Sequence, residues 1–202
     1  MPVAYASDVK RKTLLRCAKD LLHEQGYART TLADVAKRSH IPLGNVYYYF
    51  KTKQAIGLAV LLSHELDLRA MFAAISAEHM DPVMRLRALI ASPIGHAKRI
   101  SQFGCPHGGL CHELRKLGKG SELAKAAQRM MRAYVDFAET LLRAAGLSQR
   151  DASDRALELI AGMQGAMLLS NALGSEPLLA RQLRRLESVM TEWIPAARRI
   201  RN

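Results

Sequence analysis

The sequence contains few of the residues that cross-link or interrupt a chain. It has three cysteines and seven prolines in 202 residues. Three cysteines cannot all pair, so we expect reduced thiols and no disulfide framework, as in a cytoplasmic protein. No apolar signal core follows the start, and the longest uncharged stretch, residues 159–175, is shorter than the ~20 apolar residues that a membrane span needs. We therefore expect a cytoplasmic chain with no membrane segment.

Acidic residues are scarce compared with basic ones. The chain has 18 Asp+Glu and 30 Lys+Arg, so its formal net charge is +12. Residues 1–64 carry 10 basic and 4 acidic residues, a net +6, and the much longer remainder carries 20 and 14, also a net +6. Because lysine and arginine release condensed counterions from phosphates, this charge favours a polyanionic partner. Nucleic acid and an anionic membrane surface both qualify.

Strand patterns are missing as well. Apolar residues recur at helical spacing nearly everywhere, and no run of β-branched residues bounded by turn residues predicts a strand. The sequence therefore predicts an all-α fold. The expected helices cover about 7–26, 31–39, 43–49, 53–77, 82–103 with a bend near 93–95, 109–117, 121–145, 148 or 153 to 174, and 175 onward. A boundary inside the fourth helix separates a domain of residues 1–65 from one of residues 66–202.

Residues 32–50 have the spacing of a helix-turn-helix. Val35, Ile41 and Val46 fall where such a motif has core residues, and the small Ala36 falls where its two helices cross closely. The second helix of such a pair must project from a compact support to enter a major groove about 12 Å wide. The motif therefore predicts DNA binding, and it favours nucleic acid over a membrane as the polyanionic partner.

Side chains suited to contacts with DNA surround this motif. The basic and hydroxyl groups nearest to it are those of Lys10, Arg11, Lys12, Thr30, Thr31, Lys51 and Lys53. Thr31 can cap a helix, with Asp34 completing a capping-box pattern, and the amides at that N-terminus also favour phosphate. The three tyrosines at 47–49 spread over about 300° of a helix, so at least one hydroxyl faces water or DNA. The alternative for the aromatic run is core packing, which we expect for Phe50.

The stretch from Leu14 to about Leu66 resembles the DNA-binding domain of the TetR family. Residues 47–53 match that family's aromatic-aromatic-His-Phe-Lys-x-Lys signature, with tyrosine in place of the histidine at position 49. His40 stands where the turn usually has glycine, and histidine tolerates positive φ better than most residues. The resemblance implies phosphate contacts from Thr31, Tyr48 and Lys53, and groove contacts from Leu43, Gly44, Asn45, Tyr47 and Tyr49.

The same resemblance implies an N-terminal three-helix DNA-binding domain followed by a helical effector-binding and dimerisation domain. The expected function is that of a sequence-specific transcriptional regulator, a repressor that a small-molecule effector releases from its double-stranded DNA operator. The expected partners are operator DNA, an effector of unknown identity and a second copy of the chain. We expect neither enzymatic activity nor a metal or other cofactor.

The last expected helix carries an apolar seam. Its members step by 4, 3, 4 and 3 residues, which aligns them on one face suited to packing against another helix. They are Leu179, Leu183, Leu186, Met190 and Trp193. The last two expected helices resemble the intersubunit four-helix bundle of the same family, which implies that this seam forms the dimer interface. A dimer would also place two recognition helices on half-sites about 34 Å or a multiple apart. The alternative is a seam within one chain.

An effector pocket in this architecture would lie among the helices of residues 84–167. Methionine adapts to irregular shapes, so a pocket rich in it suits a flexible apolar or aromatic ligand. The expected effector-binding residues are Ile100, Phe103, Cys105, His107, Met130, Tyr134, Phe137, Met163, Gln164 and Met167. The alternative is that the apolar members belong to the core.

Residues 104–114 gather potential metal donors beside a glycine-rich turn, namely Cys105, His107, Cys111, His112 and Glu113. Their spacing is not that of a recognised zinc site, and adjacent residues on a helix point about 100° apart. Three alternatives follow: a metal sensor, a thiol sensor or cysteine-dependent enzyme using Cys105, and a structural role in which both cysteines are small apolar fillers. The structural role is the interpretation that we prefer.

Overall fold

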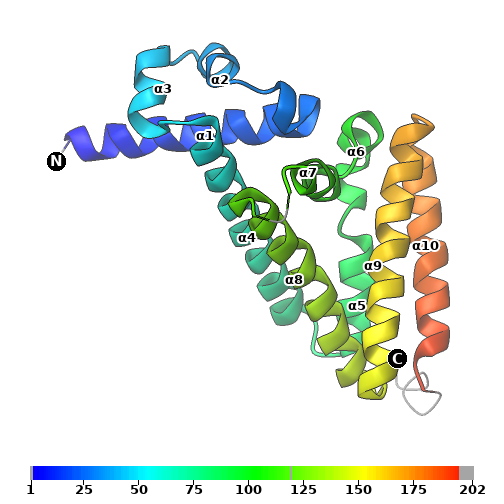
Figure 1. Ribbon diagram of the computed structural model, residues 1–202. Coiled ribbons are helices and arrows are strands. Elements are labelled where there is room, and N and C mark those ends of the chain that lie inside the picture. The colour runs from blue at the N-terminus through cyan, green and yellow to red at the C-terminus, as the bar shows by residue number, and fades with distance from the viewer. Residues whose placement is uncertain (1, 119, 196–202) are drawn as a thin grey trace. The chain divides into compact units, whose positions relative to one another are not determined.

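The computed structural model describes residues 2–118 and 120–195, with side chains from Asp8 onward, and within these ranges the chain forms helices and no strand. The helices, in chain order, are α1 (Pro2–Arg29), α2 (Leu32–Ser39), α3 (Leu43–Tyr49), α4 (Lys53–Glu78), α5 (Pro82–Ala91), the short 3-10 helix η1 (Ile94–His96), α6 (Ala97–Phe103), α7 (Pro106–Arg115), α8 (Glu122–Ala144), α9 (Gln149–Ala172) and α10 (Glu176–Trp193) (Figure 1). The predicted all-α fold is confirmed. None of the described helices is both long enough and apolar enough to cross a membrane.

The chain divides into two compact units. The first contains residues 1–66 and 106–130, and the second contains residues 67–105 and 131–202. The first break falls next to the predicted boundary at 65/66, but the predicted division into two continuous stretches differs from the observed one. Residues 106–130, which include all of α7 and the start of α8, group with the N-terminal helices. Helices α4 and α8 therefore each contribute to both units.

Helices α1, α2 and α3 pack around a small core in the first unit. Leu14, Ala18, Val35 and Val46 are fully buried there, each with an exposed fraction of 0%. Val35 and Val46 are among the residues that the sequence predicts to be core, because helical spacing sets which residues share a face. This core supports α2 and α3, the helix-turn-helix, against α1 (Figure 1).

Local capping signals predict the boundaries of α2 well. Thr31 caps α2: its hydroxyl accepts a hydrogen bond from Asp34 N at 3.1 Å, and the Asp34 carboxylate accepts one from Thr31 N at 2.8 Å. The pKa of Asp34 is lowered first by the Thr31 hydroxyl, which donates to Asp34 Oδ2 at 2.7 Å, and then by the bond from Thr31 N. His40 ends α2 with φ 55°, the left-handed conformation expected at this turn. The predicted capping box and the positive φ of His40 are both confirmed.

Two predicted helix starts are wrong. Helix α1 begins at Pro2 instead of Ser7 and continues beyond Gly26 to Arg29, with a kink at that glycine. Helix α7 begins at Pro106 instead of Gly109. The reason is that proline fits the first turn of a helix, where its missing N–H would have no partner, so it starts α7 before the glycines are reached.

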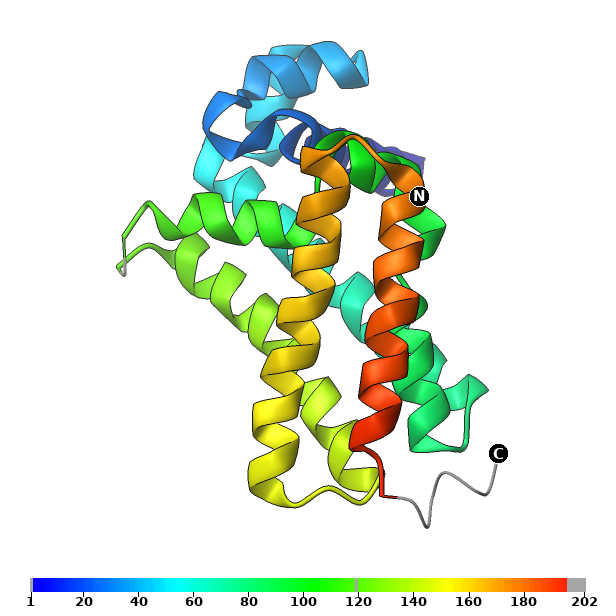
Figure 2. The same ribbon diagram turned by 90° about the vertical axis from the view of Figure 1, so that its right-hand side faces the viewer.

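The second unit has one continuous hydrophobic core that includes α9 and α10, which run side by side in Figure 2. Leu179, Leu183 and Met190 of α10 have exposed fractions of 0%, 1% and 0%, and Leu186 and Trp193 pack against the same core. Leu179, Leu183 and Met190 therefore face the core of a single chain, and their predicted place in a dimer interface is wrong. For Leu186 and Trp193, which are only partly buried, that place stays a prediction. Helical periodicity shows that a face is apolar without showing which surface covers it.

Candidate nucleic-acid interface

Helix α3 presents one face to solvent and anchors the other in the core. Val46 and Phe50 are buried, whereas Leu43, Tyr47 and Tyr48 have exposed fractions of 39%, 48% and 71%. Exposed large apolar and aromatic side chains beside one another are unusual on a surface that contacts only water. The exposed face of α3 is therefore the candidate recognition surface, and it carries most of the residues that were predicted to face the groove.

Gly44 and Asn45 lie between these side chains and are also exposed. A Cβ atom added to Gly44 would meet nothing within 4 Å. Glycine inside a helix costs about 0.5–1 kcal/mol relative to alanine, and here no neighbouring atom of the described chain requires it. The smooth patch that Gly44 leaves on α3 is suited to close approach by a molecule outside the chain.

Tyr49 differs from the two tyrosines before it. It is only partly exposed, and its ring meets the ring of Tyr48 edge-on, with centroids 5.1 Å apart and planes at 89°. This contact orients Tyr48, the most exposed aromatic side chain on the helix. Tyr47 and Tyr48 are thus better placed than Tyr49 to contact a partner.

Thr30 does not fit its predicted role. Its exposed fraction is 3%, its hydroxyl donates a hydrogen bond to Gly26 O at 2.7 Å, and Thr30 Oγ1 accepts a hydrogen bond from Gln25 Nε2 at 3.3 Å. A buried hydroxyl with both partners inside the chain cannot reach a phosphate. The prediction for Thr30 is therefore wrong, and this residue stabilises the turn between α1 and α2. Thr31, by contrast, is exposed.

Lys53 also has partners within the first unit. Its ammonium group donates to Ala28 O at 2.7 Å and lies 4.6 Å from the centre of the Tyr27 ring. Lys53 is partly exposed, so a phosphate contact would share or replace these interactions. Lys51, two residues earlier, is exposed. Lys51 is therefore the better candidate for a phosphate contact that leaves the fold unchanged.

The predicted effector residues differ in burial and in the unit to which they belong. Ile100, Met163 and Met167 are buried in the core of the second unit, whereas Phe103 is 40% exposed. The Phe137 ring stacks on Phe72 with centroids 4.0 Å apart, so two aromatic faces already cover each other. The remaining members are divided between the units: Met130 and His107 belong to the first, and Cys105, Tyr134 and Gln164 belong to the second.

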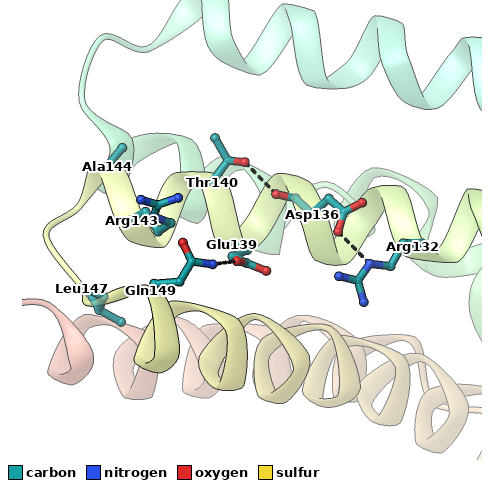
Figure 3. A pocket seen from close by; sticks show the side chains of 8 residues that line it. All are labelled: Arg132, Asp136, Glu139, Thr140, Arg143, Ala144, Leu147 and Gln149. Atoms are coloured by element: carbon teal, nitrogen blue, oxygen red, sulfur yellow. Dashed lines mark hydrogen bonds and ion pairs between the residues drawn. The ribbon is translucent and has the colours of Figure 1, made fainter.

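One hollow of the second unit lies elsewhere, on α8 and the turn into α9. This cavity, of about 650 Å³, is lined by Arg132, Asp136, Glu139, Thr140, Arg143, Ala144, Leu147 and Gln149 (Figure 3). None of these was predicted to bind an effector. Several of its polar groups pair with one another, as Arg132 Nε does with Asp136 Oδ1 at 2.7 Å and Gln149 Nε2 with Glu139 Oε1 at 2.6 Å. The polar lining differs from the apolar pocket that the sequence predicts.

The cysteine- and histidine-rich segment is divided among separate contacts. Cys111 Sγ donates to Ala127 O at 3.2 Å, and His107 Nε2 lies 3.1 Å from Nδ1 of His64. Within residues 2–118 and 120–195, no three His, Cys, Asp or Glu side chains are grouped as metal ligands would be. The sequence did not single out His64, because 43 residues separate it from its partner.

His64 is buried, and burial is the main reason why its pKa falls to about 3 from a usual value of 6.5. The nearby His107, Lys19 and His23 lower it further, because each disfavours a second positive charge. His64 is therefore neutral at physiological pH, as an interior histidine that joins α4 to α7.

Comparisons with known proteins agree with the geometry of α2 and α3. The family of bacterial regulatory proteins called the tetR family matches residues 14–60, which contain the whole helix-turn-helix. The HTH-type transcriptional regulator LmrA of Bacillus subtilis is 28% identical over 179 residues, covering 84% of this chain and 90% of that protein. The HTH-type transcriptional repressor DhaR of Mycobacterium sp. is 27% identical over 167 residues, covering 78% and 80%.

A solved structure extends the likeness over both units. A TetR-family transcriptional regulator from Agrobacterium tumefaciens superposes with a TM-score of 0.79 at 20% identity, covering 91% of this chain and 98% of that chain. At this identity the likeness concerns the fold. It covers the helices of the second unit, which the family match at residues 14–60 does not reach.

Proposed function

Because this chain belongs to the TetR family of bacterial regulatory proteins and is a helix-turn-helix transcriptional regulator, we propose that it works as a homodimeric repressor, released from its operator by a small effector. The observation that carries the proposal is the exposed face of α3, where Leu43, Tyr47 and Tyr48 accompany Gly44, whose Cβ position is open within the described residues. In this proposal α3 enters the major groove, Tyr47 contacts base edges and Tyr48 contacts the phosphate backbone.

The electrostatics of the first unit support a phosphate-binding surface. Lys10, Arg11, Lys37 and Lys51 are all exposed there, whereas Arg38, which is also exposed, forms an ion pair with Glu24 at 2.7 Å. Exposed cations near α2 and α3 attract the DNA backbone and hold the duplex in register, without reading its sequence.

Exposed leucines on α9 support a dimer. Leu157, Leu168 and Leu169 of α9 and Leu173, its C-cap residue, have exposed fractions of 53%, 66%, 48% and 69%. So much apolar surface along one helix is characteristic of a protein interface. We propose that this face of α9 pairs with the same face of a second copy, in place of the buried seam of α10.

The effector would bind in the second unit. By analogy with the family, its binding would change the position of the two recognition helices and lower their joint affinity for DNA. An effector can do this only through different affinities for the two states, and a coupling of about 1–3 kcal/mol is typical.

Quantitative DNA binding tests the proposal. Fluorescence anisotropy would compare a fragment from upstream of the protein's own gene with a scrambled fragment, at several salt concentrations. We expect selective binding that Tyr48→Ala weakens by at least about five-fold, since lost DNA contacts cost about 1–3 kcal/mol.

Lys51→Ala and Lys98→Ala form a matched pair for the phosphate contact. Both lysines are exposed, but Lys98 lies in the second unit. We expect Lys51→Ala to lower the slope of log affinity against log salt by about one and Lys98→Ala to leave it unchanged. Equal binding of both fragments, with Tyr48→Ala without effect, would contradict sequence-specific regulation.

A further inference from the structure

Helix α1 is interrupted at Gly26, which has φ 82° and ψ 167°. Amides that follow such a break begin a new turn, so they lack the carbonyl that a continuous helix would provide. The carboxylate of Glu113, on α7, supplies the acceptors. Tyr27 N lies 2.6 Å from its Oε2 atom and Ala28 N lies 2.6 Å from its Oε1 atom. One side chain of α7 thus completes the hydrogen bonding of α1, within the first unit.

Gly26 and Glu113 fit each other. A Cβ atom at residue 26 would lie 2.8 Å from Glu113 Oε2, closer than such contacts occur, and the positive φ independently favours glycine. The carboxylate therefore lies directly against the backbone of the break. This arrangement makes the contact one of defined geometry rather than a loose surface ion pair.

The same turn is held from its other sides by residues of the first unit. Lys53 bonds to Ala28 O, and the Tyr27 ring packs against Gly57 of α4, where an added Cβ would lie 2.9 Å from Tyr27 Cε2. Thr30 bonds back to Gly26 O. The turn leads directly to Thr31, the N-cap of α2, so its orientation determines where the helix-turn-helix starts.

We propose that Glu113 is a positioning residue for DNA binding, through which α7 sets the orientation of the turn that begins the helix-turn-helix. Helix α7 is covalently joined to the second unit at both sides: Cys105 precedes Pro106, and α8 passes from the first unit to the second between Met130 and Met131. A change in the second unit can thus reach Tyr27 and Ala28 through the chain and this carboxylate. The inference rests on the operator binding and effector release proposed above.

Glu113→Gln tests the role of the carboxylate with little change in shape. The glutamine side chain has one oxygen that can accept a hydrogen bond, and its NH2 group would face the other backbone N–H. One of the two hydrogen bonds from Tyr27 N and Ala28 N is therefore lost. Glu122→Gln is the matched control, because Glu122 is an exposed residue of the same unit that pairs with Lys125 on its own helix. Both changes remove one negative charge, which by itself strengthens attraction to DNA.

Two quantities are measured on the full-length protein: amide hydrogen exchange without DNA, and affinity for an operator duplex selected by the wild-type protein. We expect Glu113→Gln to accelerate exchange at Tyr27 and Ala28 by about ten-fold and to weaken operator binding by about ten-fold, the loss expected from one hydrogen bond to a charged group. Glu122→Gln should leave exchange at both amides unchanged and should bind DNA at least as tightly as the wild type.

The outcomes separate this inference from the proposed function. A wild-type protein that selects no duplex refutes both. A wild-type protein that binds its operator, while Glu113→Gln binds within two-fold of Glu122→Gln or exchanges normally at Tyr27 and Ala28, refutes the role of Glu113 alone. Should the glutamine variant fail to fold, Glu113→Asp replaces it, because aspartate keeps the charge but is too short to reach both amides and is expected to act in the same direction.

Discussion

Replacing Gly44 with alanine is expected to increase the stability of the protein and to weaken its binding to DNA. It lies on the exposed face of α3, in a helix, with open space where a Cβ would be. Gly44→Ala should therefore raise the free energy of unfolding by about 0.5–1 kcal/mol, because alanine loses less backbone entropy on folding. The same methyl group should weaken operator binding, since it stands where DNA would approach the helix.

Chemical denaturation and anisotropy on the same preparations measure the two effects. Gly109→Ala is the matched control, because Gly109 is also exposed, helical and open around its Cβ, but lies on α7. It should gain stability without losing affinity. If Gly44→Ala gains stability and binds the operator as tightly as the wild type, α3 does not approach DNA at this residue.

At the scale of elements, the His64–His107 contact makes the packing of α4 against α7 sensitive to pH. The pKa of His64 is lowered to about 3 in the folded chain, whereas it is near 6.5 in the unfolded chain. Between these two pH values, the unfolded chain binds a proton at His64 and the folded chain does not. Stability is therefore fully present above about pH 6.5 and is lost as the pH falls from there toward 3. The slope from this residue is at most about 1.4 kcal/mol per pH unit.

Urea unfolding between pH 7.5 and pH 5 measures this loss. His64→Gln removes the titrating group while keeping a polar partner for His107, so the variant should lose less stability than the wild type over that interval. His96→Gln, at an exposed histidine of the second unit, is the control and should follow the wild type. Parallel curves for the wild type and His64→Gln would show that His64 binds its proton equally in both states.

Elements also differ in how far they follow from local sequence. The bounds of α2 depend on Thr31, Asp34 and His40, all within or beside the helix, and these are predicted correctly. The start of α7 depends on Pro106 and on contacts with α1 far away in the sequence. Local patterns therefore predict helices that carry their own caps better than helices that depend on a distant partner.

At the scale of the whole molecule, the proposed dimer depends on the outer face of α9. Leu168→Arg should shift the protein toward monomer, raising the dimer dissociation constant by at least about 100-fold, because two-fold symmetry removes an apolar contact from both copies. Operator affinity should fall with it, since the two half-sites are then bound independently. Leu117→Arg, at a leucine of similar exposure in the first unit, is the control.

Sedimentation equilibrium gives the association state directly. A Leu168→Arg variant that remains dimeric at the concentrations where the wild type is dimeric would place the interface on another surface. In that case the side chain at residue 168 would be exposed to solvent in the dimer as well as in the single chain.

The sequence by itself determined the helical fold, the helix-turn-helix and the aromatic surface of α3. These depend on spacings of a few residues: apolar periodicity, a capping box at Thr31 and Asp34, and the pattern at residues 47–53. Such features are local, so short stretches of sequence are sufficient to specify them. The tyrosines at 47 and 48 are exposed, as the spread of three consecutive residues around a helix requires for at least one of them.

Only the tertiary structure decided which distant groups meet and which faces they cover. It buried the Leu179–Met190 seam within the chain, used Thr30 and Lys53 to hold a turn, and brought Glu113 to amides 86 and 85 residues away. The physical reason is that helical periodicity and side-chain chemistry show what kind of group one surface can contact. Which group of the chain actually lies against that surface depends on how the whole chain packs. The sequence shows that Glu113 has a carboxylate, which could equally bind a metal ion. Its position next to Gly26 in the structure shows that it accepts hydrogen bonds from the backbone of α1.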